Sequence, residues 1–446
     1  MNFGGSFWNW GRWQVSTSIA ELLSNPECTL EDLLDDEDIV QEFKNLNSKL
    51  IDFMDKEKAM KLLEYMTLEP DPDNDDHRRC YKYPFLACEI FACEINQIIE
   101  MFFGDDTLLL DVLYKFLDDA PGADVNPVLG GYFAKVVLGF LNRKPKEILT
   151  YSFDHYDQLL KLTNLMTCKS LSELISKFIC IEEGVLETET YLGKRCELVQ
   201  KVIEKTDPTC DSEENLNAAY VLIDLVSKSG DIVDGKIIMD KITNRETIDL
   251  VLKNVFSLNP TCVRSGVATL SSLLNHNFIN VDHHIKQGSD DEATAHTGED
   301  DDEPMLEDDG EEDSPLIDAI CARVKDFAEY LSSPSAENIA TCYGGKIAPL
   351  GSSKLRVIEF CYNLFRLNNK KINAEILQAN LLRVLVDLLF QYEWNNMLHN
   401  VVEKIINNIL EGDHPDLKKN LLEETQLVTR LVEVSVNNSM FEFGSK

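Results

Sequence analysis

Apolar residues recur at intervals of three and four along most of the chain, which is the pattern of a helix with one buried face. Residues 37–54 show it clearly, with one apolar face formed by Ile39, Phe43, Leu46, Leu50 and Phe53. Comparable patterns predict helices at 84–103, 105–118, 127–141, 154–166, 170–182, 193–205, 214–229, 245–254, 261–275, 316–332, 354–367, 373–391, 395–410 and 421–436. The strict alternation typical of strands is nearly absent. The chain is therefore predicted to be all-α.

The predicted helices are joined by short connections that carry Pro, Gly or Asn. Pro84, Pro127, Pro208 and Pro260 each stand where a helix is expected to start. No strict sequence repeat is present, but the rhythm of helix pairs is typical of a helical-repeat stack, and a single bundle rarely needs so many helices. We predict a HEAT/armadillo-like solenoid, an architecture whose long surface usually binds proteins.

One long acidic segment interrupts this pattern. Residues 288–315 contain 14 Asp and Glu and no Lys or Arg. Because such a segment cannot bury a core, we predict that 283–315 is a disordered insertion between two parts of the helical domain, 1–282 and 316–446. Ser and Thr residues of this segment could be phosphorylated, or the segment could be a solvated acidic loop without such a role. The candidate sites, from acidic or Ser-Pro contexts, are Ser289, Thr297 and Ser314.

The net charge restricts the class of binding partner, and the cysteine pattern indicates the cellular compartment. A formal net charge of -36 disfavours nucleic acid and anionic membranes, and favours basic protein surfaces. The 12 Cys include no CxxC pair and mostly fall in apolar helical patterns, so free core thiols are expected. No signal peptide or membrane-length apolar run is visible. We expect a soluble protein of the cytoplasm, with the nucleus as a further option.

Catalytic motifs are missing from the sequence. HExxH, GxSxG, GxxxxGK[ST] and GxGxxG are all absent, so we predict no enzyme activity, no cofactor and no metal. The nearest metal-like cluster, Asp282-His283-His284, has adjacent histidines that rarely face one ion. The glycines of residues 343–351 are preceded by no predicted strand, and so indicate a turn between helices rather than a phosphate cradle.

Residues 80–90, CYKYPFLACEI, contain the first candidate for partner binding. Tyr81, Lys82 and Tyr83 come directly before Pro84, where a helix is predicted to start. Both tyrosines could pack at the start of that helix, or they could form an amphipathic cluster on a partner surface. The local sequence favours neither interpretation.

Residues 390–405, FQYEWNNMLHNVVEKI, contain the second candidate. On a continuous helix, Trp394 would share an apolar face with Leu398, Val401 and Ile405. Polar residues would occupy the other side, namely Asn395, Asn396 and His399. These amides have three interpretations: a solvated face, hydrogen bonds to a neighbouring helix, or contacts with a partner.

Three basic residues complete the candidate set in this acidic chain. Arg143 and Lys144 follow a predicted helix and could meet acidic partner residues or cap the carbonyls of the helix end. Arg356 could also meet a partner, or could pair with Glu359 three residues later.

Several stretches together resemble one known family, in the family's order along the chain. They are FWNW at 7–10, CTLEDLLDDEDIVQEFKNLNSKLIDF at 28–53, CYKYPFLACEI at 80–90, NPVLGGYFAKVVLGFLNRKPKEIL at 126–149, IAPLGSSKLRVIEFCYNLF at 347–365 and the 390–405 stretch. They are similar to motifs of the SAPS-domain family. Ala348, Lys354 and Met397 depart from the family pattern in ways that largely keep size or charge.

This resemblance implies a non-catalytic regulatory subunit that binds the catalytic subunit of a type 6 Ser/Thr protein phosphatase and helps select its substrates. It also implies contact with ankyrin-repeat subunits, with the catalytic metals held by the partner. Family members usually continue into a long polar tail, so the chain is expected to be a fragment. Two rival hypotheses remain: a karyopherin-like transport adaptor for basic targeting segments, motivated by the acidity, and a hydrolase with a site of scattered His and Asp.

Overall fold

The computed structural model describes residues 19–71, 76–104, 106–120, 122–182, 184–185, 191–276, 314–334, 339–340 and 346–443. The chain divides into two compact units. The first comprises Met1–Phe178 and Gly184–Glu187, and the second comprises Ile179–Glu183 and Thr188–Lys446. Within the described ranges the only strands are β1 (Ile339–Ala340) and β2 (Lys346–Ile347), an antiparallel pair of two residues each. The prediction of an all-α protein is confirmed.

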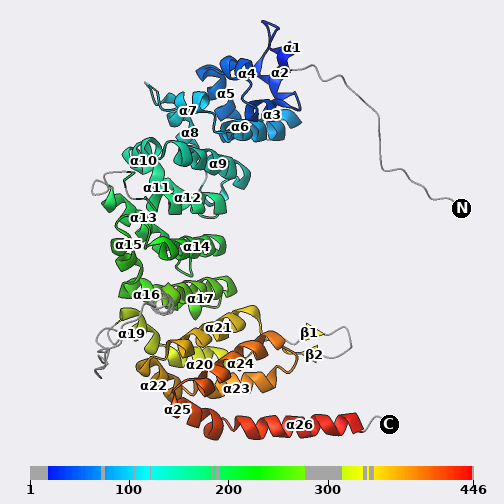
Figure 1. Cartoon of the computed structure of the whole chain (residues 1–446), viewed down its shortest axis with the longest axis vertical. Helices are drawn as coiled ribbons and strands as arrows, with labels where there is room; N and C mark the ends of the chain where they lie inside the picture. The colour runs from blue at the N-terminus through cyan, green and yellow to red at the C-terminus, as the bar shows by residue number, and fades with distance from the viewer. Residues whose placement is uncertain are drawn as a thin grey trace, which may run out of the picture. The chain divides into compact units, whose positions relative to one another are not determined.

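The first unit is built around α5, which packs against α6, α8 and α9 (Figure 1). Its buried side chains are those of the apolar stripes, such as Leu62 on α5 and Leu113 on α8. Its helices are α1 (Ile19–Leu22), α2 (Leu30–Leu34), α3 (Ile39–Lys44), α4 (Ser48–Phe53), α5 (Lys56–Thr67), α6 (Tyr83–Phe91), α7 (Asn96–Glu100), α8 (Leu108–Asp119), α9 (Pro127–Arg143), α10 (Pro145–Asp154), α11 (Tyr156–Lys161) and α12 (Lys169–Ile179).

The second unit contains the remaining helices and both strands. The helices are α13 (Leu192–Lys205), α14 (Ser212–Lys228), α15 (Gly235–Ile242), α16 (Arg245–Val255), α17 (Pro260–Leu274), α19 (Pro315–Cys321), α20 (Val324–Ser332), α21 (Ser352–Leu367), α22 (Lys370–Gln378), α23 (Leu381–Gln391), α24 (Asn396–Glu411), α25 (Pro415–Lys419) and α26 (Leu427–Phe443).

Two rows of helices run through the second unit. In one row α14 packs on α17, α17 on α21 and α21 on α24 (Figure 1). In the other, α15 packs on α16, α16 on α19, α19 on α22 and α22 on α23. Stacking of sequential helices in two rows agrees with the layered stack that the sequence predicts. The helices on either side of the acidic segment, α17 and α19, belong to the same compact unit.

The helices of the first row begin at a common edge. Asn259 Nδ2, at the start of α17, donates to Ser212 Oγ at the start of α14 over 2.8 Å. Ser353 Oγ, at the start of α21, donates to the carbonyl oxygen of Pro260 over 3.4 Å. Side chains one turn into α17 and α21 are therefore neighbours, and this arrangement positions a pocket described below.

Several predicted helices are divided in the structure. The single helix expected over residues 37–54 is wrong, because α3 ends at Lys44 and α4 begins at Ser48. Between them Leu46 has a φ of 57° and is 62% exposed, while the Asn47 side chain accepts a hydrogen bond from the Leu50 N–H. The helix expected over 373–391 also divides, at Asn380, whose φ is 53°. Asn residues that cap a helix or adopt a left-handed conformation interrupt an otherwise continuous apolar stripe.

The proline and cysteine predictions have mixed outcomes. Pro127 and Pro260 open α9 and α17, and Pro84 lies in the first turn of α6, whereas Pro208 lies in a turn before α14. The described cysteines are free thiols, and those fully buried in helices include Cys88, Cys262 and Cys361.

None of the described helices combines the length and the apolar character needed to cross a bilayer.

Candidate functional site

Tyr81, Lys82 and Tyr83 lie where a π-helical turn, Arg78–Lys82, continues into α6. Lys82 Nζ donates to the carbonyl oxygen of Asp35 over 2.9 Å, and the Tyr83 hydroxyl donates to Asp35 Oδ1 over 3.4 Å. Tyr83 is buried and its ring lies 5.2 Å from that of Tyr65. Lys82 and Tyr83 therefore join α6 to the end of α2, whereas Tyr81 is 66% exposed and remains available to a partner.

Arg143 and Lys144 are paired with carboxylates of the first unit. Arg143 Nε lies 2.8 Å from Glu94 Oε2, and Lys144 Nζ lies 2.7 Å from Glu100 Oε1. The hydrogen bond that Lys144 donates to Glu100 raises the pKa of Lys144. The sequence left two interpretations open, acidic residues of a partner or the carbonyls of the helix end. In the structure both side chains instead pair with carboxylates of the first unit, and Lys144 also lies 3.8 Å from Glu147 Oε1.

The helix expected over 395–410 is present as α24 (Asn396–Glu411), but the helix face expected to include Trp394 is wrong. Helix α23 ends at Gln391 and α24 begins at Asn396, so Trp394 lies in the connecting turn and shares no helix face with Leu398. Asn395 caps α24, because its side-chain oxygen accepts the Leu398 N–H over 3.1 Å. His399 Nε2 lies 3.0 Å from the carbonyl oxygen of Tyr392 and ties the turn to the helix. Among the described residues, neither Asn395 nor Asn396 bonds to a neighbouring helix.

This turn forms one wall of an open groove of about 650 Å³. The opposite wall is the loop 348–352 and Leu355 of α21. Gly351, with a φ of +85°, lets the loop turn into α21. Trp394, at 88% exposure, and Met397, at 65%, are large apolar side chains that lie in this groove, and no described element covers them. Exposed large apolar residues gathered in a groove are typical of a protein interface.

The groove contains residues that no sequence pattern indicated as site residues. Pro349, Leu350 and Met397 belong to stretches that resemble family motifs. The structure shows that two of these stretches, 347–365 and 390–405, meet in one place. The expectation that no strand precedes the loop is wrong, because β2 ends at Ile347 after pairing with β1.

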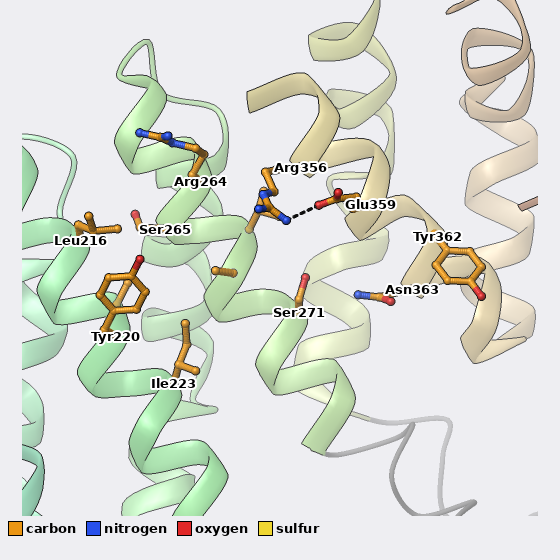
Figure 2. A pocket seen from close by; sticks show the side chains of 13 residues that line it. Leu216, Tyr220, Ile223, Arg264, Ser265, Ser271, Arg356, Glu359, Tyr362 and Asn363 are labelled. Carbon is orange, nitrogen blue, oxygen red and sulfur yellow. Dashed lines mark hydrogen bonds and ion pairs between the residues drawn. The ribbon is translucent and has the colours of Figure 1, made fainter. Parts of the chain in front are cut away.

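A second pocket, of about 600 Å³, lies between α14, α17 and α21 (Figure 2). Arg356 lines it, and its Nη1 lies 2.7 Å from Glu359 Oε2, so the structure confirms the pairing that was one of the two interpretations open from the sequence. Arg264, Tyr220 and Tyr362 also line it, and no pattern in the sequence indicated any of these three. Arg356 is thus the one predicted site residue found in this pocket.

The remaining candidates for metal binding, nucleophilic chemistry and phosphorylation can be checked among the described residues. Within these ranges no group of three or more His, Cys, Asp or Glu side chains is placed to hold a metal ion. Burial raises the pKa of the Cys88 and Cys361 thiols to about 12, which leaves them protonated and poorly nucleophilic. Ser314 precedes α19 as its N-cap residue. Ser289, Thr297 and the Asp282-His283-His284 cluster lie outside the described residues.

A family model and the similar known proteins indicate the same family. The family model described as SIT4 phosphatase-associated protein matches residues 138–445. The chain is 28% identical over 449 residues to serine/threonine-protein phosphatase 6 regulatory subunit 3 of Gallus gallus, covering 94% of the chain and 49% of the relative. It is 29% identical over 419 residues to regulatory subunit 2 of Homo sapiens, covering 91% and 41%.

A more distant relative is the extragenic suppressor of kinetochore protein 1 of Schizosaccharomyces pombe, 24% identical over 422 residues, covering 86% of the chain and 48% of the relative. The chain thus spans about half the length of these relatives.

Proposed function

The chain belongs to the SIT4 phosphatase-associated protein family, and on this premise we propose that it is a non-catalytic regulatory subunit. It binds the catalytic subunit of a type 6 Ser/Thr protein phosphatase and directs its choice of substrate. The observation that carries the proposal is the similarity, over nine-tenths of the chain, to proteins named as regulatory subunits of phosphatase 6. The family motifs that meet in the groove at Trp394 support it.

The groove of residues 348–352 and 391–397 is the surface we assign to the catalytic subunit. Trp394 and Met397 together present the aromatic and thioether side chains that are enriched at protein interfaces. The turn that carries Trp394 is held by the Asn395 cap and by His399, so little ordering is needed on binding.

Size-exclusion chromatography of this chain with the type 6 catalytic subunit tests the proposed function. The type 2A catalytic subunit serves as the comparison. Selective co-elution with the type 6 subunit is the expected result. Co-elution with neither subunit, under conditions where a known family member binds, overturns the proposed function for this chain.

The variants Trp394→Ala and Met397→Ala test the assignment of the groove. Each is expected to weaken binding of the catalytic subunit at least about tenfold, as for an exposed anchor at the centre of an interface. Ile237→Ala is the matched control, because Ile237 is an exposed apolar side chain on α15 and does not line the groove. Equal binding by all three variants would remove the groove from the interface and leave the regulatory function to another surface.

The remaining proposals concern further partners and location. We propose contact with ankyrin-repeat subunits, on the family resemblance, and residence in the cytoplasm and the nucleus, which the free thiols support. Pull-down of an ankyrin-repeat subunit and imaging of a tagged chain test these two points. The karyopherin-like alternative rests on net charge alone, and the family match favours the phosphatase subunit instead.

A further inference from the structure

The pocket between α14, α17 and α21 carries basic side chains on a strongly acidic chain. Helix α17 contains a single charged residue, Arg264. Helix α21 adds Arg356 and Arg366, with Glu359 as its only acidic residue. Helix α14 carries Glu213, Glu214, Asp224 and Lys228, but none of these lines the pocket. The charged lining is therefore two arginines and one glutamate, in a chain of 42 basic and 78 acidic residues. Such a local reversal of charge directs which partner groups can approach.

Among the residues that the structure describes, no acidic side chain compensates the charge of Arg264. Its Nε donates to the carbonyl oxygen of Pro260 over 3.2 Å, and its Nη2 donates to Thr261 Oγ1 over 3.3 Å. These contacts, both within its own helix, fix the direction of the guanidinium. In the described part of the chain, no carboxylate lies within ion-pair distance of Arg264. Arg245, on α16, is different, because its Nε lies 2.9 Å from Asp249.

Arg356 is only partly engaged. Its Nη1 bonds to Glu359, and the side chain is 61% exposed. A guanidinium has five N–H donors, so most of those on Arg356 are free to bind a further acceptor. Figure 2 shows Arg264 and Arg356 at the same end of the pocket, which agrees with the common edge at which α17 and α21 begin.

The rest of the pocket suits a peptide. Tyr220 lines one side and is 51% exposed, and Tyr362 lines the other, with the Arg366 guanidinium 5.8 Å from its ring centre. Ser271 and Asn363 supply groups that can bond to a peptide backbone (Figure 2). A volume of about 600 Å³ accommodates a few residues rather than a folded domain.

We propose that this pocket binds an extended segment of a partner protein that is rich in Asp and Glu. Its carboxylates bond to Arg264 and Arg356, which can each bind a carboxylate through two N–H groups. A neighbouring apolar side chain of the segment packs on Tyr220. A short acidic peptide fits better than nucleic acid, because a long polyanion would also meet the acidic remainder of the chain. The use of this pocket to select substrates rests on the proposed function, whereas the binding itself does not.

Fluorescence anisotropy with labelled peptides and the isolated 446-residue chain tests the proposal without any phosphatase. The probe is a peptide of Asp, Glu and Leu, and its control has Asn and Gln in place of every Asp and Glu. Saturable binding of the acidic peptide alone, weakening as salt rises, is expected. Absence of binding to the acidic peptide, or equal binding to both peptides, overturns the proposal.

Two charge-reversal variants distinguish peptide binding at the pocket from attraction by the overall charge of the molecule. Arg264→Glu is expected to weaken binding of the acidic peptide at least about tenfold, as for loss of one charge-assisted hydrogen bond. Arg245→Glu changes the net charge equally but lies outside the pocket, and is expected to change binding less than about twofold. Equal weakening by both variants would show that net charge alone governs binding, and would overturn the assignment.

A third variant moves the affinity in the opposite direction. Glu359→Gln frees Arg356 from its carboxylate and is expected to tighten acidic-peptide binding several-fold. Unchanged or weaker binding contradicts the role given to Arg356. Two further measurements test whether the chain itself occupies the pocket. They are peptide binding by a chain lacking residues 288–312 and sedimentation of the free chain. Peptide binding that appears only after that deletion, or only in a monomeric fraction of a self-associating chain, assigns the pocket to the chain itself.

Discussion

At the scale of single residues, Arg195 is the largest completely buried side chain among the described residues of the second unit. Its Nε donates to the carbonyl oxygen of Ile179 over 2.9 Å, its Nη2 to that of Val233 over 2.8 Å, and its Nη1 lies 3.3 Å from Asp234 Oδ2. Burial lowers the pKa of Arg195, but three acceptors compensate for the lost water. Arg195 therefore joins α13 to the segments before it and before α15.

Replacing Arg195 should cost more stability than replacing its carboxylate partner. We expect Arg195→Met to lower the free energy of unfolding by about 3 kcal/mol, because two buried carbonyls lose their donor. Asp234→Asn should cost about 1 kcal/mol, because Asn tolerates the left-handed conformation at this position and leaves both carbonyl bonds intact. Chemical denaturation of the two variants measures the difference. A larger loss for Asp234→Asn would show that the ion pair, and not the carbonyl bonds, holds Arg195.

Asp207 gives a pH-dependent contribution in the turn between α13 and α14. Hydrogen bonds from Lys253, 2.8 Å away, and from Thr209 lower its pKa to about 2 from an ordinary 3.8. Since the folded-state pKa is the lower one, the stabilisation is complete above pH 3.8 and is lost as the pH falls toward 2.

Comparison of the chain with its Asp207→Asn variant checks this assignment. At neutral pH the variant should be less stable by about 0.5–1 kcal/mol, the usual range for a solvent-accessible pair with good geometry. The difference should shrink as the pH falls below 3.8. A difference in stability that stays constant from pH 7 to pH 3 would exclude titration of Asp207 as its source.

At the scale of secondary-structure elements, buried amides join three helices of the second unit. Asn215 Nδ2 on α14 donates to Asn254 Oδ1 on α16 over 3.1 Å, and Ser265 Oγ on α17 donates to Asn215 Oδ1 over 2.6 Å. Inter-helix amides were among the interpretations of the 390–405 stretch, but the structure places them here. An Asn inside a helical pattern looks the same in sequence whether it faces solvent or another helix.

Helices α16 and α17 also approach closely at Gly266. A Cβ at this position would lie 2.9 Å from the Asn254 Cβ and 3.0 Å from the Val251 carbonyl oxygen. The contact leaves room for hydrogen only, which explains a glycine in the middle of a helix despite its lower helix propensity.

The variant Gly266→Ala should therefore destabilise the second unit. We expect a loss of about 1–3 kcal/mol from overpacking against α16. Gly131→Ala on α9 is the matched control, because its Cβ would meet nothing closer than Ser170 Oγ at 3.9 Å. That variant should gain up to about 0.5–1 kcal/mol from helix propensity. If both variants behave alike in thermal unfolding, the close approach at Gly266 has no energetic consequence.

At the scale of the whole molecule, we predict that the fold does not depend on the acidic segment. Helices α16 and α19, and likewise α17 and α21, pack directly on each other from opposite sides of it in the sequence. Deletion of residues 288–312 should leave the melting temperature nearly unchanged, because shortening a long connection changes closure entropy little. Calorimetry of the deleted chain measures this. Loss of cooperative unfolding would instead make the segment part of the structure.

Net charge describes the molecule only on average. The -36 of the chain favours basic partners, yet the pocket of α14, α17 and α21 presents two arginines that the sequence does not place together. Arg264 and Arg356 are 92 residues apart, and no periodic pattern in the sequence indicates that α17 and α21 begin at one edge.

The sequence by itself determined the helical class, the buried stripes, the free core cysteines and the family. These follow from local periodicity and from short motifs, which act within one or two turns of helix. Arg356 and Glu359 were paired correctly for the same reason, being one turn apart.

Tertiary structure decided where helices break, which charges are consumed, and which motifs meet. Trp394 became an exposed groove residue because Asn395 caps α24, while Lys82, Arg143 and Lys144 each pair with at least one group 44 or more residues away in sequence. Such pairings depend on how helices pack, and packing is fixed by shape and by many distant contacts together. Periodicity identifies the buried face of each helix, but does not identify the helix that covers it.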